Sequence, residues 1–134
     1  MSDQSEINKL LVCEFYNLVF NERKVRLGFE RYVAVDYIQH NPMAAQGRES
    51  AIDFIERILK NVPKRTVKIV RTIAEDDLVA LHIHVREEPE DLGDAHADFF
   101  RVENGIIVEH WDVIQPVPQH GSAQNVMFSD GIDR

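Results

Sequence analysis

The sequence predicts an α+β fold in which three N-terminal helices pack on a meandering antiparallel sheet. Two observations lead to this class. Apolar residues recur every three to four positions in the segments before Pro63, which is the period of amphipathic helices. After Pro63 the period changes to two, which is the period of strands. Helices followed by a run of strands is the pattern of an α+β fold, and we expect residues 1–134 to form a single domain.

The three helices are predicted from their apolar periodicity and from the residues that end them. The first covers residues 4–20 and the second covers residues 25–34. The third begins at about Arg48 and ends before Pro63, because proline lacks the N–H that a helix interior needs. The stretch DYIQHNPMAAQG, residues 36–47, is rich in turn-forming residues, so we expect an irregular loop there.

Four strands are predicted after the helices. The first two are joined by an acidic turn. The last two are joined by Asn104 and Gly105, a pair typical of two-residue hairpins because both residues tolerate positive φ. The predicted strands cover residues 66–74, 78–87, 95–103 and 106–116.

Composition and charge exclude several classes of function. A formal net charge of -8 disfavours binding to nucleic acid, since a phosphate backbone would be repelled. Cys13 is the only cysteine, so neither an internal disulfide nor a thiolate metal site is expected. No apolar run approaches the ~20 residues that cross a bilayer. The N-terminal stretch MSDQSEINKL lacks the basic and apolar regions of a signal peptide, so we expect a cytoplasmic protein.

Ionisable residues recur at every second position in three of the predicted strands, so each set shares one face of its strand. If these strands are neighbours, their polar faces merge into one surface, and His40 in the YIQHNP loop closes one end. The alternative is a solvated outer face, which is common in antiparallel sheets; both remain open for His82 and His84. The sets are His82, His84 and Arg86; His96, Asp98 and Phe100; and Val108, His110, Asp112 and Ile114.

Asp112 is the strongest candidate for chemistry. Val108 and Ile114 flank it on the same face, so we expect its carboxylate to line a cavity, where apolar surroundings strengthen a carboxylate as a proton acceptor. Histidines two residues apart and nearby carboxylates also suit zinc or iron, but chance pairs are frequent among six histidines, and we expect no metal. No Gly-x-Ser-x-Gly elbow and no glycine-rich phosphate loop occurs.

Several segments resemble the SnoaL-like polyketide cyclase family of the nuclear-transport-factor-2-like superfamily. They are YIQHNP with the following GRE, then ADFFRVENGIIVEHWDVIQPVP, and the final NVMF. The resemblance implies a cone, in which a curved antiparallel sheet wraps three N-terminal helices as a cystatin-like α+β barrel and encloses a pocket. It also implies a homodimer. Cyclases of this family close a ring by aldol condensation without a cofactor.

The same resemblance assigns roles to residues. Matching GIIVEHWD to the family's glycine-to-aspartate motif places the acid/base aspartate on Asp112, and a pocket histidine of the cyclase falls on Asp98. We therefore expect a cofactor-independent enzyme that acts on a small hydrophobic carbonyl compound by aldol condensation, cyclisation or isomerisation. The expected catalytic residues are Asp112, Asp98 and His110, and the expected substrate contacts are His40, His82, His84, His96, Phe100 and Tyr37.

Two alternative functions stay open, and so does the role of the apolar face of one predicted strand. Epoxide hydrolysis needs an Asp-Arg-Asp arrangement, for which Arg86 is the remaining candidate because Arg101 has the wrong parity. A small-molecule binding module without catalysis is the other alternative, since fold does not fix function. The apolar face of the second predicted strand offers either a dimer surface or a contact with the helices; it consists of Val79, Leu81, Ile83 and Val85.

Overall fold

A computed structural model describes residues 3–118 and 127–128 of the chain. It confirms the predicted α+β class, with three helices packed on a five-stranded, curved and unclosed sheet. Within the described residues, no helix is long and apolar enough to cross a membrane. The helices are α1 (Asp3–Phe20), α2 (Val25–Tyr32) and α3 (Arg48–Asn61), and the strands are β1 (Val33–Gln39), β2 (Thr66–Glu75), β3 (Leu78–Arg86), β4 (Asp94–Glu103) and β5 (Ile106–Pro116).

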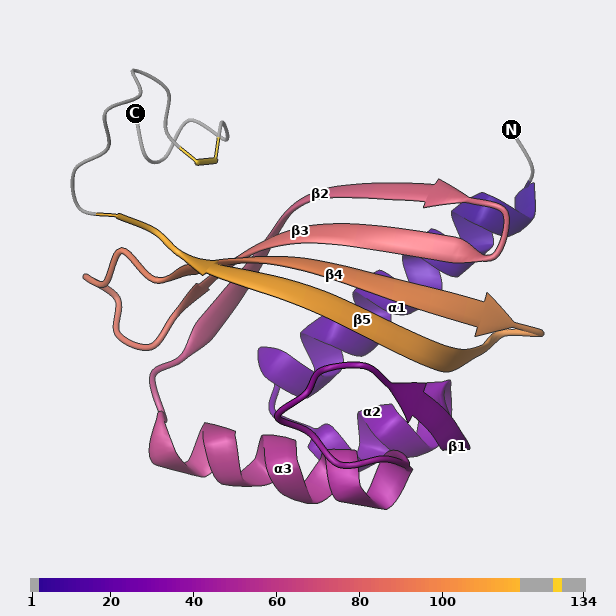
Figure 1. The fold of residues 1–134 in the computed structure, drawn as a ribbon, viewed down its shortest axis with the longest axis horizontal. Coiled ribbons are helices and arrows are strands. Elements are labelled where there is room, and N and C mark those ends of the chain that lie inside the picture. The colour runs from indigo at the N-terminus through magenta and orange to yellow at the C-terminus, as the bar shows by residue number, and fades with distance from the viewer. Residues whose placement is uncertain (1–2, 119–126, 129–134) are drawn as a thin grey trace.

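The sheet runs in the order β1-β5-β4-β3-β2, and Figure 1 shows β2 to β5 as long neighbouring strands. These four strands pair antiparallel, as predicted. At the hairpin between β4 and β5, Asn104 has φ 50° and Gly105 has φ 78°, which is the conformation expected of this turn.

The prediction was wrong for β1. Val33 and Ala34 were placed in the second helix and the following residues in a loop, whereas residues 33–39 form an edge strand parallel to β5. The strand has only seven residues and pairs with β5 at its two ends, with an irregularity between Val33 and Ile38. Its stability comes from contacts with β5, α2 and α3, which local propensity does not encode.

The apolar face of β3 packs on the helices, so it is not available as a dimer surface. Its four residues are at most 4% exposed, and α1 contacts both β2 and β3. The helices therefore cover one face of the curved sheet, which we call the concave face, and leave the opposite, convex face open. The four residues of β3 are Val79, Leu81, Ile83 and Val85.

Two polar side chains link the helices to one another and to the sheet by hydrogen bonds. The Asn21 side chain, just after α1, donates to the carbonyl of Val67 and accepts from the N–H of the same residue, each at 3.1 Å. The Arg23 guanidinium donates to the carbonyl oxygens of Leu59, Val62 and Arg65 at 2.9 to 3.1 Å. These bonds hold the end of α3 and the start of β2 in a fixed position relative to α1.

Candidate functional site

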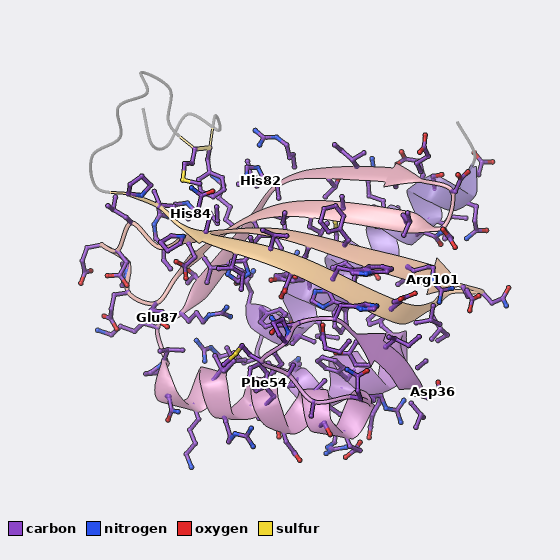
Figure 2. All side chains as sticks on the ribbon, in the orientation of Figure 1. Asp36, Phe54, His82, His84, Glu87 and Arg101 are labelled. Atoms are coloured by element: carbon purple, nitrogen blue, oxygen red, sulfur yellow. The ribbon has the colours of Figure 1, made fainter. Side chains whose placement is uncertain are left out.

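A cavity of about 420 Å³ lies between the concave face of the sheet and the helices. Its wall is mainly apolar, and Figure 2 shows Phe54 of α3 on the side of that helix that faces the sheet. A cavity of this size and character is typical of small-molecule sites. The apolar lining residues include Phe15, Phe20, Phe29, Phe54, Ile55, Ile58, Phe100, Ile107 and Ile114, and the polar ones are Tyr16, Tyr37, Gln39, Asn41, Arg65, His96, Asp98, His110 and Asp112.

A bulge in β5 changes which apolar residue shares the cavity face with His110. Arg101 pairs with Glu109 and Val102 pairs with Ile107, so Val108 is an extra residue on β5. Ile107, 1% exposed, therefore lines the cavity with His110, whereas we expected Val108. Strict alternation of side chains along a strand predicts the face on which each residue lies only as far as the next bulge.

Asp112 lies in the wall of the cavity and is held by one neighbour. The Asn41 side-chain N–H₂ group donates to both carboxylate oxygens of Asp112, at 3.0 and 2.9 Å. Asn41 is itself fixed, because its side-chain oxygen accepts the Met43 N–H at 2.8 Å. Asp112 stands directly opposite Asp98 in the pairing of β4 with β5. Two carboxyl groups therefore face the same cavity from adjacent strands.

A chain of hydrogen bonds shows that Nδ1 of His110 carries a proton. The backbone N–H of Asn41 donates to Gln39 Oε1 at 2.9 Å, which identifies that atom as the amide oxygen. The same oxygen lies 2.8 Å from His110 Nδ1, so Nδ1 carries a proton and donates it. The other ring nitrogen, Nε2, lies 3.0 Å from Asp98 Oδ2. His110 is thus oriented from both sides, by an amide and by a carboxyl group.

One proton lies between His110 and Asp98. Either an imidazolium donates it to the carboxylate, or a protonated Asp98 donates it to the neutral ring. In both forms His110 and Asp98 are bonded to each other, whereas Asp112 accepts hydrogen bonds only from Asn41 among the described residues. Asp112 is therefore the carboxylate best placed to take a proton from a ligand.

The buried tyrosine and histidine beside these carboxyl groups stay neutral. Burial raises the pKa of Tyr37 to about 12, and the charge of Asp112 acts in the same direction, against the hydrogen bond from Gln39. Since Gln39 Nε2 donates to the Tyr37 oxygen at 2.8 Å, the phenol hydrogen is left to donate elsewhere. Burial also lowers the pKa of His96, although the charge of Asp98 opposes that shift. His96 Nδ1 lies 3.8 Å from Asp98 Oδ1.

Asp98, His110 and Asp112 are also the residues best placed to hold a metal ion. One ligand atom of each lies within 4.8 Å of the others. Both ring nitrogens of His110 already have hydrogen-bond partners, so a cation there would have to replace the proton that joins His110 to Asp98. The expectation of a site without a metal stays a prediction.

Three of the expected substrate contacts lie outside the cavity. His82 and His84 are on the convex face, where both rings stack on Phe128 with centroids 4.8 and 4.3 Å apart (Figure 2). The reason is register: Leu81 pairs with Asp98, so the apolar set of β3 shares the cavity face and the histidines point the other way. His40 is exposed and stacks on Trp111 with ring centroids 4.9 Å apart.

The cavity brings together the other six expected residues and three that the sequence analysis missed. The expected ones are Asp112, Asp98, His110, His96, Phe100 and Tyr37, and the missed ones are Gln39, Asn41 and Arg65. A signal for two of these was present, because Tyr37, Gln39 and Asn41 alternate as residues on one face of a strand do. Treating the segment as a loop concealed it. No local pattern marks Arg65.

The sequence and the structure were compared with known proteins. A family model described as SnoaL-like domain matches residues 12–110. No curated protein matches the sequence. Solved structures with the same fold include TsrD from Streptomyces laurentii, which is 19% identical with a TM-score of 0.67 and alignment over 85% of this chain and 90% of that chain.

Two further structures share the fold at similarly low identity. A candidate polyketide cyclase from Acidithiobacillus ferrooxidans is 16% identical, with a TM-score of 0.68 over 85% of this chain and 91% of that chain. A candidate ketosteroid isomerase from Kribbella flavida is 17% identical, with a TM-score of 0.69 over 93% of this chain and 97% of that chain. At these identities the likeness establishes the fold alone.

Proposed function

Because the chain belongs to the SnoaL-like domain family, we propose that it is a cofactor-independent enzyme that moves a proton on a small carbonyl compound. The reaction is an aldol condensation that closes a ring, or an isomerisation. One observation carries the proposal: Asp112 lies in the wall of a mainly apolar cavity, held by Asn41 and opposite the Asp98–His110 pair. Cyclase and isomerase candidates share this fold, which supports the same class of reaction.

The proposed chemistry begins with Asp112 as general base. A carbonyl group acidifies the neighbouring C–H, and a carboxylate in a dry cavity within hydrogen-bonding reach removes that proton. Negative charge then develops on the carbonyl oxygen and needs a donor. The neutral Tyr37 phenol supplies that donor, since its oxygen already accepts from Gln39 and its hydrogen is uncommitted. Asp98 and His110 hold the proton that can be returned to the product.

Hydrogen–deuterium exchange tests the proposal without knowledge of the natural substrate. Small cyclic and aromatic ketones and 1,3-diketones are incubated with the protein in D₂O, and deuterium at the carbon beside the carbonyl is followed by NMR. Exchange above the buffer rate for at least one compound is expected. If no compound exchanges faster but some raise the melting temperature, the protein is a binding module and the proposal fails.

Replacing Tyr37 with Phe is expected to lower the exchange rate by about 10²–10³-fold, the usual effect of removing one donor to a developing oxyanion. Because the pKa of Tyr37 is raised to about 12, the phenol stays protonated at neutral pH. The wild-type rate should therefore show no loss from this residue between about pH 6 and pH 10. An unchanged rate in Tyr37→Phe would exclude the phenol as the donor.

Replacing Asn41 with Ala tests whether the amide positions the base. We expect kcat to fall by roughly tenfold while KM changes by less than about twofold, since the lost hydrogen bonds orient Asp112 and do not touch the ligand. Asn41→Asp should be worse, because it places a third carboxyl group beside Asp112. A rise in KM with unchanged kcat would instead make Asn41 a ligand contact.

The two arginines that the sequence offered for the hydrolytic alternative lie outside the cavity. Arg86 Nε donates to the carbonyl of Asp91 and lies on the face that carries His84, away from the cavity. Arg101 Nε donates to Glu109 at 2.8 Å. Neither of these arginines lines the cavity, whereas Arg65 does so together with Asp98 and Asp112. Formation of a diol from small cyclic epoxides, offered beside the ketones, would favour hydrolysis.

A further inference from the structure

Arg65 is the one cation in the cavity wall, as far as the described residues show. It lies in the turn between α3 and β2, where its N–H donates to the Val62 carbonyl at 3.0 Å and its own carbonyl accepts from Arg23 at 3.0 Å. Its guanidinium carbon lies 5.5 Å from the centre of the Phe20 ring, within range of a cation–π contact. Backbone and side chain are therefore both held before any ligand arrives.

The hydrogen-bonding capacity of this guanidinium is incompletely used. Arg65 Nη1 is buried and has no hydrogen-bond partner among the described residues. Asp98 Oδ1, in the same cavity, is also buried without a hydrogen-bond partner among the described residues, although His96 Nδ1 lies 3.8 Å from it. A buried donor without a partner is destabilising, and more so when it is charged. Because Arg65 lines the cavity, a ligand oxygen bound there would supply the missing partner.

Two cavity residues, Tyr16 and His96, are close enough to Arg65 to feel its charge, and both also feel the charges of Asp98 and Asp112. Burial raises the pKa of Tyr16 well above its ordinary value and lowers the pKa of His96, and the charge of Arg65 acts on both side chains. Both residues line the cavity and remain uncharged at neutral pH. This part of the wall thus offers an anionic oxygen the Arg65 guanidinium and two neutral side chains capable of hydrogen bonding, with Asp98 and Asp112 as the nearby carboxyl groups.

We propose that Arg65 binds a carboxylate of the ligand, so that the ligand is an amphipathic acid with an apolar body. The identity of the substrate rests on the proposed function as well: the substrate is then a keto acid whose carbonyl group lies next to Asp112. Arginine presents its N–H groups as a planar fork that matches a carboxylate, and such charge-assisted bonds are stronger than neutral ones.

Binding measurements with matched acids and esters test the proposal. Benzoate and 2-naphthoate are compared with their methyl esters by calorimetry at constant ionic strength, on wild type, Arg65→Met, Arg65→Lys and Lys64→Met. Lys64 is the matched control, because its side chain is 67% exposed and its replacement removes the same charge one residue away. Arg65→Met keeps an apolar chain over Phe20 and should fold with an unchanged or higher melting temperature.

At least one acid should bind wild type more tightly than its ester, and Arg65→Met should weaken that acid on the order of 10- to 100-fold with little effect on the ester. Arg65→Lys should retain part of the preference, and Lys64→Met should retain all of it. Equal affinity for acid and ester, no binding of either acid, or equal losses in Arg65→Met and Lys64→Met would overturn the proposal. Asp112→Asn should still bind the acids. The binding result can therefore be interpreted even if the proton-transfer proposal fails.

Discussion

Asp112→Asn is expected to lower the rate of deuterium exchange by about 10²–10⁴-fold, the usual contribution of a general base. An amide has the same shape as the carboxylate but does not accept a proton at neutral pH. Its single oxygen can still accept one of the two hydrogen bonds that Asp112 accepts from Asn41. The melting temperature should therefore remain within a few degrees of wild type, because no buried group loses its partner.

The matched control for this variant is Asp36→Asn. Asp36 is exposed within β1, and Figure 2 shows it beside that strand at the edge of the molecule. This change removes the same charge from a residue outside the cavity wall, so its exchange rate should equal that of wild type. If Asp112→Asn exchanges as fast as the control, the base lies elsewhere. A folded Asp112→Asn that still binds ketones but does not exchange them would assign the proton transfer to Asp112.

The sequence predicted the helices and the four antiparallel strands because their periodicity is strong and local. It also placed Asp98, His110 and Asp112 on one surface, since residues two apart on a strand share a face. It wrongly placed His82 and His84 on the same surface, because the alternation of side chains along a strand does not determine how that strand is aligned with its neighbour. The observed pairing sets Leu81 against Asp98, and this single fact moves His82 and His84 to the convex face.

The remaining errors also come from information that is not local. The bulge at Val108 is visible only when β5 is paired with β4. Asn41 and Gln39 join the site because β1 pairs with β5, and the seven residues of β1 had no strong pattern of their own. Arg65 reaches the cavity because the turn after α3 directs it there. Of these contacts, the pairing of β1 with β5 links segments far apart in the sequence, whereas the bulge depends on the register within one hairpin.

Leu81→Ala is expected to destabilise the fold by about 2–5 kcal/mol, the usual effect of truncating a fully buried leucine. Leu81 is 1% exposed and lies on the cavity side of the sheet, beside Asp98 on the adjacent strand. The melting temperature should fall by roughly 10 °C. Val113→Ala is the matched control: Val113 is 65% exposed on the convex face, so its truncation should change the stability by less than about 0.5 kcal/mol.

The same two variants separate the two roles that the apolar face of β3 could have had. If Leu81 lay in a dimer contact, Leu81→Ala would lower the mass measured by light scattering and leave the melting of the monomer almost unchanged. Burial beneath the helices predicts the opposite, a large loss of stability at constant mass. We propose, from the family resemblance, a homodimer that uses the convex face, where Phe99 is 40% exposed and pairs with Trp111. Replacing Phe99 with Asp should lower the mass without reaching the cavity, because the carboxyl groups and the core share the other face of the sheet.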